Sequence, residues 1–163
     1  TVLMNAVCEN DTDTCLILLQ HGADMSAQDG LGKTPLHHAA ERGAVDILYI
    51  LIAKGANVMA KSNYDGSTLL MSACKNDSID IALILLERGA DLSARDIGGK
   101  TPLHHAAKCG AVNILSILIS KGADVMAVSN NGYVPRDLAE KGWATATDIS
   151  PHLNGHEDCA KIL

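Results

Sequence analysis

The sequence predicts an all-α repeat solenoid, a stack of helix-turn-helix units from which turn-rich fingers project. Glycine-alanine phrases recur along the chain at nearly constant spacing. The chain contains one Trp, three Tyr and no Phe, so its core must use small and aliphatic side chains, which suit packed helices better than a β-sandwich. The apolar stripes are too short to form stable helices alone, and stacked neighbours would supply the missing contacts.

Four glycine-alanine phrases define the length of the repeat. GADMSA, GANVMA, GADLSA and GADVMA begin, in that order, at Gly22, Gly55, Gly89 and Gly122. A threonine precedes each of these glycines at one fixed distance, at Thr1, Thr34, Thr68 and Thr101. The phrases therefore recur with a nearly fixed period, which is typical of a solenoid.

A second, longer period lies over the first, because two kinds of unit alternate. The octet KTPLHHAA begins at Lys33 and again at Lys100, and TVLMNA at Thr1 corresponds to TLLMSA at Thr68. Duplication of a two-repeat unit is the simplest explanation. Directly after the identical octets the two copies differ, with ER in the first and KC in the second.

Each unit reads as two short helices followed by a turn, as the second unit illustrates. Thr34 is a good N-cap and Pro35 suits the first helical position. A stripe at helical spacing follows, made of Leu36, Ala39 and Ala40. Gly43 should end this helix. A second apolar stripe runs from Val45 to Ile52, and the segment after it is rich in turn-forming residues.

This pattern resembles the ankyrin repeat, which has a period near 33 and a T-P-L-H-x-A signature. Residues 34–39 and 101–106 match that signature, and the resemblance covers essentially the whole chain. It implies L-shaped repeats whose helix pairs stack. It places β-hairpin fingers near residues 28–33, 61–67, 95–100 and 128–133. The chain is then one domain, 1–163, with repeats at about 1–28 (partial), 29–61, 62–95, 96–128 and 129–163.

Two departures from the family pattern carry structural expectations. Asn10 and Asp77 stand where the family has the glycine between the two helices, and asparagine accepts the left-handed conformation more easily than aspartate does. The finger at 61–67 contains one extra residue. The chain opens at the threonine of a repeat and closes within a second helix, so we expect it to be cut from a longer protein or to have disordered flanks.

The last repeat contains an insertion, residues 142–153. Val134 to Lys141 resembles a first helix, and Asn154 to Leu163 resembles the turn and the second helix. The insertion includes the only tryptophan, Trp143. One interpretation is an elongated helix or loop that caps the stack. The other is a binding loop anchored by Trp143, because tryptophan is enriched at interaction hot spots.

Composition excludes several classes of function. The formal net charge is −6, so the chain lacks the basic footprint of a nucleic-acid-binding protein. Its apolar runs are too short for a membrane span, and the N-terminus does not resemble a signal peptide. The five cysteines are odd in number and include no CxxC, which favours free thiols and an intracellular protein, cytoplasmic or nuclear. We expect a monomer.

The paired histidines, His37–His38 and His104–His105, invite a catalytic or metal-binding interpretation. Adjacent residues on a helix point about 100° apart and chelate poorly. The resemblance instead implies a structural role for the first histidine of each pair, whose ring hydrogen-bonds near the threonine and to the adjoining repeat. The expected structural residues are Thr34, Pro35, His37, Thr101, Pro102 and His104.

Other chemistry finds little support in the sequence. His152, His156 and Cys159 have a spacing that zinc ligands can use, but Pro151 and Gly155 interrupt the helix that would align them. There is no GxSxG, no P-loop and no GxGxxG. We therefore expect no catalytic residue, no metal and no cofactor, and we do not expect an enzyme.

A binding surface is the remaining expectation. The resemblance implies contacts at the finger tips and at the concave positions of each first helix. The finger residues are Leu31, Lys33, Tyr64, Asp65, Ile97, Lys100 and Tyr133. The concave residues are Glu41, Arg42, Lys75, Asn76, Lys108 and Cys109. With Trp143, these would bind a protein or peptide, making the chain an interaction module. The alternative is a regulatory or structural segment of a larger multidomain protein, acting by intramolecular packing.

Overall fold

The computed structural model describes residues 1–146 and 154–163. These residues form ten helices and no strand, with one isolated antiparallel bridge between Lys61 and Thr68. The helices are α1 (Val2–Cys8), α2 (Thr12–Gln20), α3 (Pro35–Arg42), α4 (Val45–Ala53), α5 (Leu69–Cys74), α6 (Ile79–Glu87), α7 (Pro102–Cys109), α8 (Val112–Ser120), α9 (Pro135–Ala146) and α10 (Asn154–Ile162). The predicted all-α repeat solenoid is confirmed.

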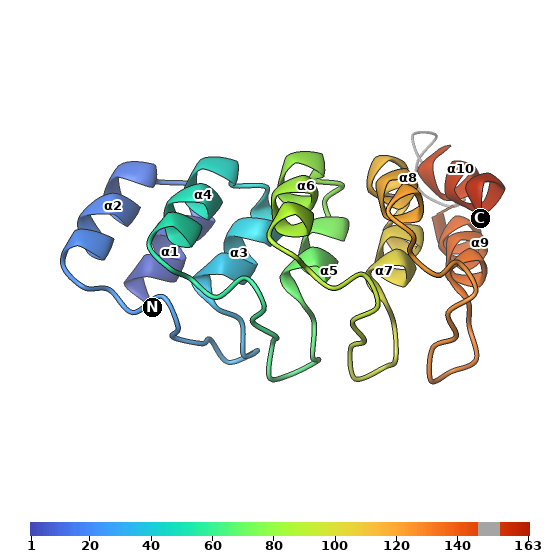
Figure 1. The fold of residues 1–163 in the computed structure, drawn as a ribbon, viewed down its shortest axis with the longest axis horizontal. Helices are drawn as coiled ribbons and strands as arrows, with labels where there is room; N and C mark the ends of the chain where they lie inside the picture. The colour runs from blue at the N-terminus through green and yellow to red at the C-terminus, as the bar shows by residue number, and fades with distance from the viewer. Residues whose placement is uncertain (147–153) are drawn as a thin grey trace.

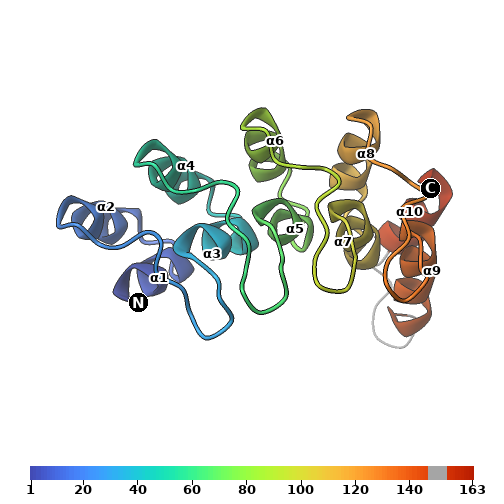
Figure 2. The same ribbon diagram turned by 60° about the horizontal axis from the view of Figure 1, so that its bottom comes forward.

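The helices form two rows that run along the stack (Figure 1). The odd-numbered helices α1, α3, α5, α7 and α9 make the first-helix row, and the even-numbered helices make the second. Each helix packs against its partner and against the next helix of its own row. The long turns between pairs project together from one side, as Figure 2 shows with that side turned forward.

The core follows this arrangement. Buried alanines, such as Ala39 and Ala106, let neighbouring helices of the first row approach closely. The second row contributes larger side chains, and Leu48, Leu85 and Leu115 are all 0 % exposed. Each such leucine contributes about 2 kcal/mol through burial. Because every pair buries one face against each neighbour, the stack is continuous rather than divided into separate cores.

The first helices begin and end as their sequences predict. Thr34 and Thr101 are the N-caps, with a proline directly after each. Gly43 and Gly110 end the two helices at φ 71° and 68°, in the left-handed region. Only glycine adopts that conformation without steric cost.

Asp77 occupies the corresponding position after α5 with φ 48°, and Asn10 does so after α1 with φ 55°. The Asp77 carboxylate has a second role. Its Oδ1 accepts a hydrogen bond from the backbone N–H of Ile114 at 3.1 Å, and its Oδ2 accepts one from Asn113 Nδ2 at 2.9 Å. The N-cap of α8 itself is Ala111, which has no capping side chain. Asp77 therefore caps the second helix of the next repeat.

Substitution of Asp77 tests this role. We expect Asp77→Ala to lower the free energy of unfolding by about 1–2 kcal/mol, because it removes the cap and keeps a non-glycine residue at positive φ. Asp77→Gly should cost less, since it relieves the backbone, and Asp77→Asn should cost least. Urea titrations of the three variants give the order. Equal losses for alanine and asparagine would contradict the capping role.

The last repeat differs from the prediction. The helix expected to end at Lys141 continues to Ala146, and the segment beginning at Asn154 starts directly as α10 instead of with a turn. Residues 142–146 thus lengthen α9, consistent with the high helix propensity of the alanines in that segment. Residues 147–153, the rest of the expected insertion, lie outside the described part of the chain.

Candidate functional site

Each finger is a tight turn closed by backbone hydrogen bonds. Asp29 N–H donates to the carbonyl of Lys33 at 3.0 Å, and Asp96 N–H donates to Lys100 in the same way at 3.0 Å. In the finger with the extra residue, Ser62 N–H donates to Ser67 at 2.9 Å, which is one residue further along the chain. The extra residue enlarges this turn without opening it.

Neighbouring fingers are tied to one another. Ser62 Oγ donates to the carbonyl of Leu31 at 2.8 Å, and Ile97 N–H donates to the carbonyl of Asp65 at 2.9 Å. Gly99 lies so close to Asn130 that an added Cβ would collide with it. These cross-finger contacts hold the tips in a fixed row.

Three apolar side chains are presented at consecutive tips. Leu31 is 47 % exposed, Tyr64 is 70 % exposed and Ile97 is 66 % exposed. Large apolar side chains held in the open on a rigid scaffold are the kind of group that anchors a protein partner. Tyr133 differs from them, because it is half-buried and its backbone carbonyl accepts hydrogen bonds from His104 and Ser129.

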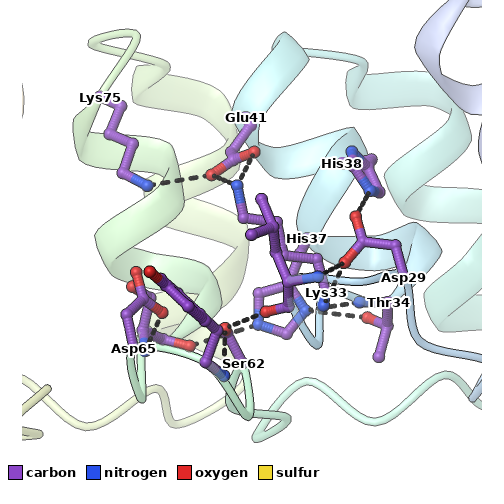
Figure 3. A network of polar contacts seen from close by, with 12 residues as sticks. Asp29, Lys33, Thr34, His37, His38, Glu41, Ser62, Asp65 and Lys75 are labelled. Carbon is purple, nitrogen blue, oxygen red and sulfur yellow. Dashed lines mark hydrogen bonds and ion pairs between the residues drawn. The ribbon is translucent and has the colours of Figure 1, made fainter. Parts of the chain in front are cut away.

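Glu41 joins two of the expected contact residues (Figure 3). Lys33 Nζ lies 2.8 Å from both carboxylate oxygens of Glu41, and Lys75 Nζ from the next repeat lies 3.0 Å from Oε1. Burial favours the protonated carboxyl, but the two lysines outweigh it and hold the pKa of Glu41 below its ordinary value. These three residues therefore form an ion-paired bridge between repeats.

Asp65 is held by its own finger. Burial opposes its ionisation, yet hydrogen bonds from Ser67 and Ser62 and the charge of Lys75 lower the pKa of Asp65 to about 2. One of these bonds, from the Ser67 N–H to Oδ1, measures 3.0 Å. The carboxylate fixes the turn that follows Tyr64, and Figure 3 shows Asp65 in the same finger as Ser62.

The first histidine of each pair is fully buried at 0 % exposure. Nδ1 of His104 accepts from the N–H of Thr101 at 3.1 Å, and Nε2–H donates to the carbonyl of Tyr133 at 2.9 Å. His37 repeats this arrangement with Thr34 and the carbonyl of Ser67. Each ring thus links its helix start to the following finger, and burial lowers the pKa of both.

The second histidine of each pair bonds to an aspartate, which the sequence reasoning did not foresee. His38 Nε2 lies 2.8 Å from Asp29 Oδ2, and His105 Nε2 lies 2.9 Å from Asp96 Oδ2. Cys8 Sγ lies 3.7 Å from Nδ1 of His38. The sequence contains a signal for this pairing, because an aspartate precedes the second histidine at the same spacing in both copies.

The other expected contact residues lie at the ends of the first helices. Arg42, Asn76, Lys108 and Cys109 are exposed there. Although Cys109 is exposed, the protein around its thiol excludes part of the solvent and raises its pKa, while Lys108 and Lys75 oppose that shift. The thiol is therefore not an activated nucleophile. Trp143 belongs to α9, but its side chain lies outside the described residues.

No group of three metal-ligating side chains occurs among the residues that the structure describes. His152 and the side chain of His156, considered as zinc ligands, lie outside them. Within the same residues, none of the helices has the length and hydropathy needed to cross a membrane. A hollow between the segments 24–28 and 55–63 lies apart from the expected contact residues, none of which lines it.

The fold and surface define a helical solenoid that presents rigid finger tips beside a charged row of helix ends. A family model described as ankyrin repeats (3 copies) matches residues 3–96 and 65–129. The chain belongs to the ankyrin-repeat family. Repeats of this family are generally protein-interaction modules.

Several curated proteins are similar to parts of the chain. Ankyrin repeat domain-containing protein 37 of Mus musculus is 45 % identical over 56 residues, covering 33 % of this chain and 35 % of that protein. The mouse B-cell lymphoma 3 protein homolog is 38 % identical over 68 residues, covering 41 % and 14 %. The mouse 2-5A-dependent ribonuclease is 41 % identical over 51 residues, covering 31 % and 7 %. Each match spans at most about a third of the relative.

Proposed function

We propose that this chain binds a partner protein through the row of finger tips and the adjoining ends of the first helices. One observation carries the proposal: Leu31, Tyr64 and Ile97 are held exposed on consecutive fingers that are tied together by hydrogen bonds. A rigid surface loses little conformational entropy on binding. Apolar anchors beside charges supply affinity, and the charges steer and select the partner.

The charged residues of this surface divide into two kinds. Glu41 pairs with both Lys33 and Lys75 across repeats, so these three residues stabilise the platform and retain one net positive charge. Arg42 and Lys108 are exposed and make no ion pair within the described residues, which leaves their charges available to a partner. Tyr64 is the most exposed of the three tips.

A triple variant tests the proposal. We expect Arg42→Glu, Lys108→Glu and Tyr64→Ala together to reduce partner capture from cell extract at least tenfold while leaving the melting temperature within about 3 °C, because all three side chains are exposed. Quantitative mass spectrometry of the captured proteins gives the ratio.

A matched control makes the same three changes in the second row and its caps: Arg88→Glu, Lys121→Glu and Tyr49→Ala. These residues are exposed too, and the change in net charge is identical. Capture should survive in this variant. Equal capture by wild-type chain and the first triple variant would count against the finger-tip surface.

The alternative function, intramolecular packing in a longer protein, is favoured by one comparison. The mouse 2-5A-dependent ribonuclease, named as an enzyme, resembles this chain over only 7 % of its length. In that case the same tips would be covered within one polypeptide. Hydrogen exchange of the finger amides in the full-length gene product would then be slower than in the isolated chain.

The proposal includes three further points. We propose that the repeats themselves catalyse no reaction, that the chain acts as a monomer, and that it functions inside the cell, in the cytoplasm or nucleus. All five cysteines are unpaired, and three of them, Cys15, Cys74 and Cys159, are buried. Free thiols of this kind suit a reducing compartment.

A further inference from the structure

The duplicated octet allows two copies of one surface to be compared within the same molecule. Lys33 and Lys100 occupy equivalent positions, because each is the first residue of an identical octet. In the first copy Lys33 is paired with Glu41. In the second copy the position equivalent to Glu41 is Lys108. The carboxylate that neutralises the first lysine is thus replaced by a second positive charge.

The ammonium group of Lys100 consequently makes no hydrogen bond or ion pair with any residue that the structure describes. Lys108 is also exposed and unpaired in that part of the chain. Lys75 lies between the two copies, because it donates to Glu41 on one side and faces α7 on the other. Figure 3 shows Lys75 reaching toward Glu41 from α5.

The repeat geometry brings the lysines to a common area. Lys75 and Lys108 occupy the same position in neighbouring repeats, at the ends of the packed helices α5 and α7. Lys100 stands eight residues before Lys108, as Lys33 stands before its partner Glu41.

The pKa values of two side chains of α7 agree with this placement. Burial lowers the pKa of His105, Asp96 opposes that shift, and the charges of Lys75 and Lys100 lower it further. Burial raises the pKa of Cys109, whereas Lys108 and Lys75 act in the opposite direction. This placement, with which the pKa effects agree, puts Lys75, Lys100 and Lys108 on one face of α7, and we call these three residues the basic patch.

The carboxylates near the basic patch are already engaged. Asp96 accepts from His105 with one oxygen and from the Lys100 N–H with the other. Glu41 accepts three bonds from Lys33 and Lys75. Asp65 accepts from Ser67. None of them pairs with the ammonium group of Lys100 or Lys108, so those two groups can take carboxylates from outside the chain.

Apolar tips adjoin the basic patch. Tyr64 and Ile97 belong to the fingers that lead into α5 and α7, and the Ile97 N–H donates to the carbonyl next to Tyr64, that of Asp65. From the start of α7 to Lys108 is about 10 Å, at 1.5 Å per helical residue. An extended chain covers about that distance in three residues.

Resting on the interaction function proposed above, we infer that this surface binds an acidic, extended segment of a partner protein. An apolar side chain of the segment packs between Tyr64 and Ile97. Two or more carboxylates about three residues away pair with Lys100 and Lys108. The net charge of −6 on the whole chain disfavours a long polyanion and restricts the attraction to this local area.

A synthetic probe tests the inference. The probe is a short fluorescent peptide with one leucine and, three positions on, four glutamates; its control has glutamines in place of the glutamates. Fluorescence anisotropy at about 50 and about 200 mM salt should show binding of the glutamate peptide at least tenfold tighter than that of the control, weakening as salt rises. Equal affinities would overturn the inference.

Two single substitutions test the difference between the two copies of the octet. Lys108→Glu should pair with Lys100, as Glu41 pairs with Lys33, and reduce the affinity for the glutamate peptide at least tenfold. Lys121→Glu makes the same charge change at the exposed end of α8 and should change the affinity less than twofold. Equal losses would show that only overall charge matters and would overturn the inference, as would tighter binding of a single-stranded oligonucleotide of equal charge.

Competition separates this inference from the proposed function. The glutamate peptide, but not the glutamine peptide, should displace the protein captured by the wild-type chain. If capture depends on Tyr64 and Arg42 yet neither peptide competes, the interaction function stands and the acidic segment is wrong. If the triple variant captures the partner as well as the wild-type chain does, both the interaction function and the acidic-segment inference fail.

Discussion

Replacement of His104 by alanine is expected to lower the free energy of unfolding by about 3 kcal/mol. The imidazole is 0 % exposed and joins the start of α7 to the following finger. Its loss leaves the carbonyl of Tyr133 without this donor and opens a cavity between two repeats. Because the link joins neighbouring repeats, the effect should appear in the unfolding of the whole stack. Urea titration followed by circular dichroism measures it.

Two further variants make the result specific. His21→Ala removes an exposed histidine whose ring makes one hydrogen bond in the described part of the chain, to the carbonyl of Ile17, and we expect a loss below about 1 kcal/mol. In a double-mutant cycle, Thr101→Ala and His104→Ala should be less than additive, since they share one hydrogen-bonded unit. Additive losses, or a small loss for His104→Ala alone, would contradict the linking role.

Helix ends and backbone conformations that depend on residues adjacent in the chain were predictable from the sequence. A threonine followed by proline begins a helix, and a glycine at a fixed distance ends it, so α3 and α7 were expected with nearly correct ends. The left-handed backbone at Asn10 and Asp77 also follows from their place in the repeat. Local sterics and capping determine these features, and both leave a direct pattern in the chain.

Most contacts between repeats were not predicted, because nothing local specifies them. The exception is the bond from the first histidine of each pair to the adjoining repeat, which the family resemblance implied. Glu41 bonds to Lys75 of the following repeat, and that pairing becomes visible only when the repeats are stacked. Asp77 was expected to be a poor substitute for glycine, yet its carboxylate caps α8. The family pattern placed the end of the first helix of the last repeat at Lys141, whereas α9 continues to Ala146, as the interpretation of the insertion as an elongated helix allowed.

This limit applies to the candidate surface as well. Lys33 and Lys100 look identical in the sequence, since both begin the same octet. They differ in the structure because the residue directly after the octet is Glu41 in one copy and Lys108 in the other, and only the first makes an ion pair. The sequence shows where the copies differ, and the geometry shows what the difference does to the charge.

Acidification from pH 7.5 to pH 5 is expected to destabilise the fold by about 2–4 kcal/mol. Burial lowers the pKa of His37, His104 and His105 in the folded chain. Below the ordinary histidine value of about 6.5, the unfolded chain therefore binds more protons than the folded chain. The stabilising contribution of the neutral histidines is fully present above that pH and is lost as the pH falls from about 6.5 toward 5. Each histidine contributes a slope of up to about 1.4 kcal/mol per pH unit.

The carboxylates affect the free energy of unfolding only over a separate range of lower pH. Lysines hold the pKa of Glu41 below its ordinary value, and hydrogen bonds lower that of Asp65 to about 2, so their contribution is lost only below about pH 4.5. Urea titrations at pH 7.5, 6.5, 5.5 and 5 isolate the histidines. NMR titration of the imidazole protons should show His104 still neutral below the ordinary histidine value of about 6.5. A free energy of unfolding that stays constant or rises toward pH 5 would mean that the buried histidines accept protons without disturbing the links between repeats.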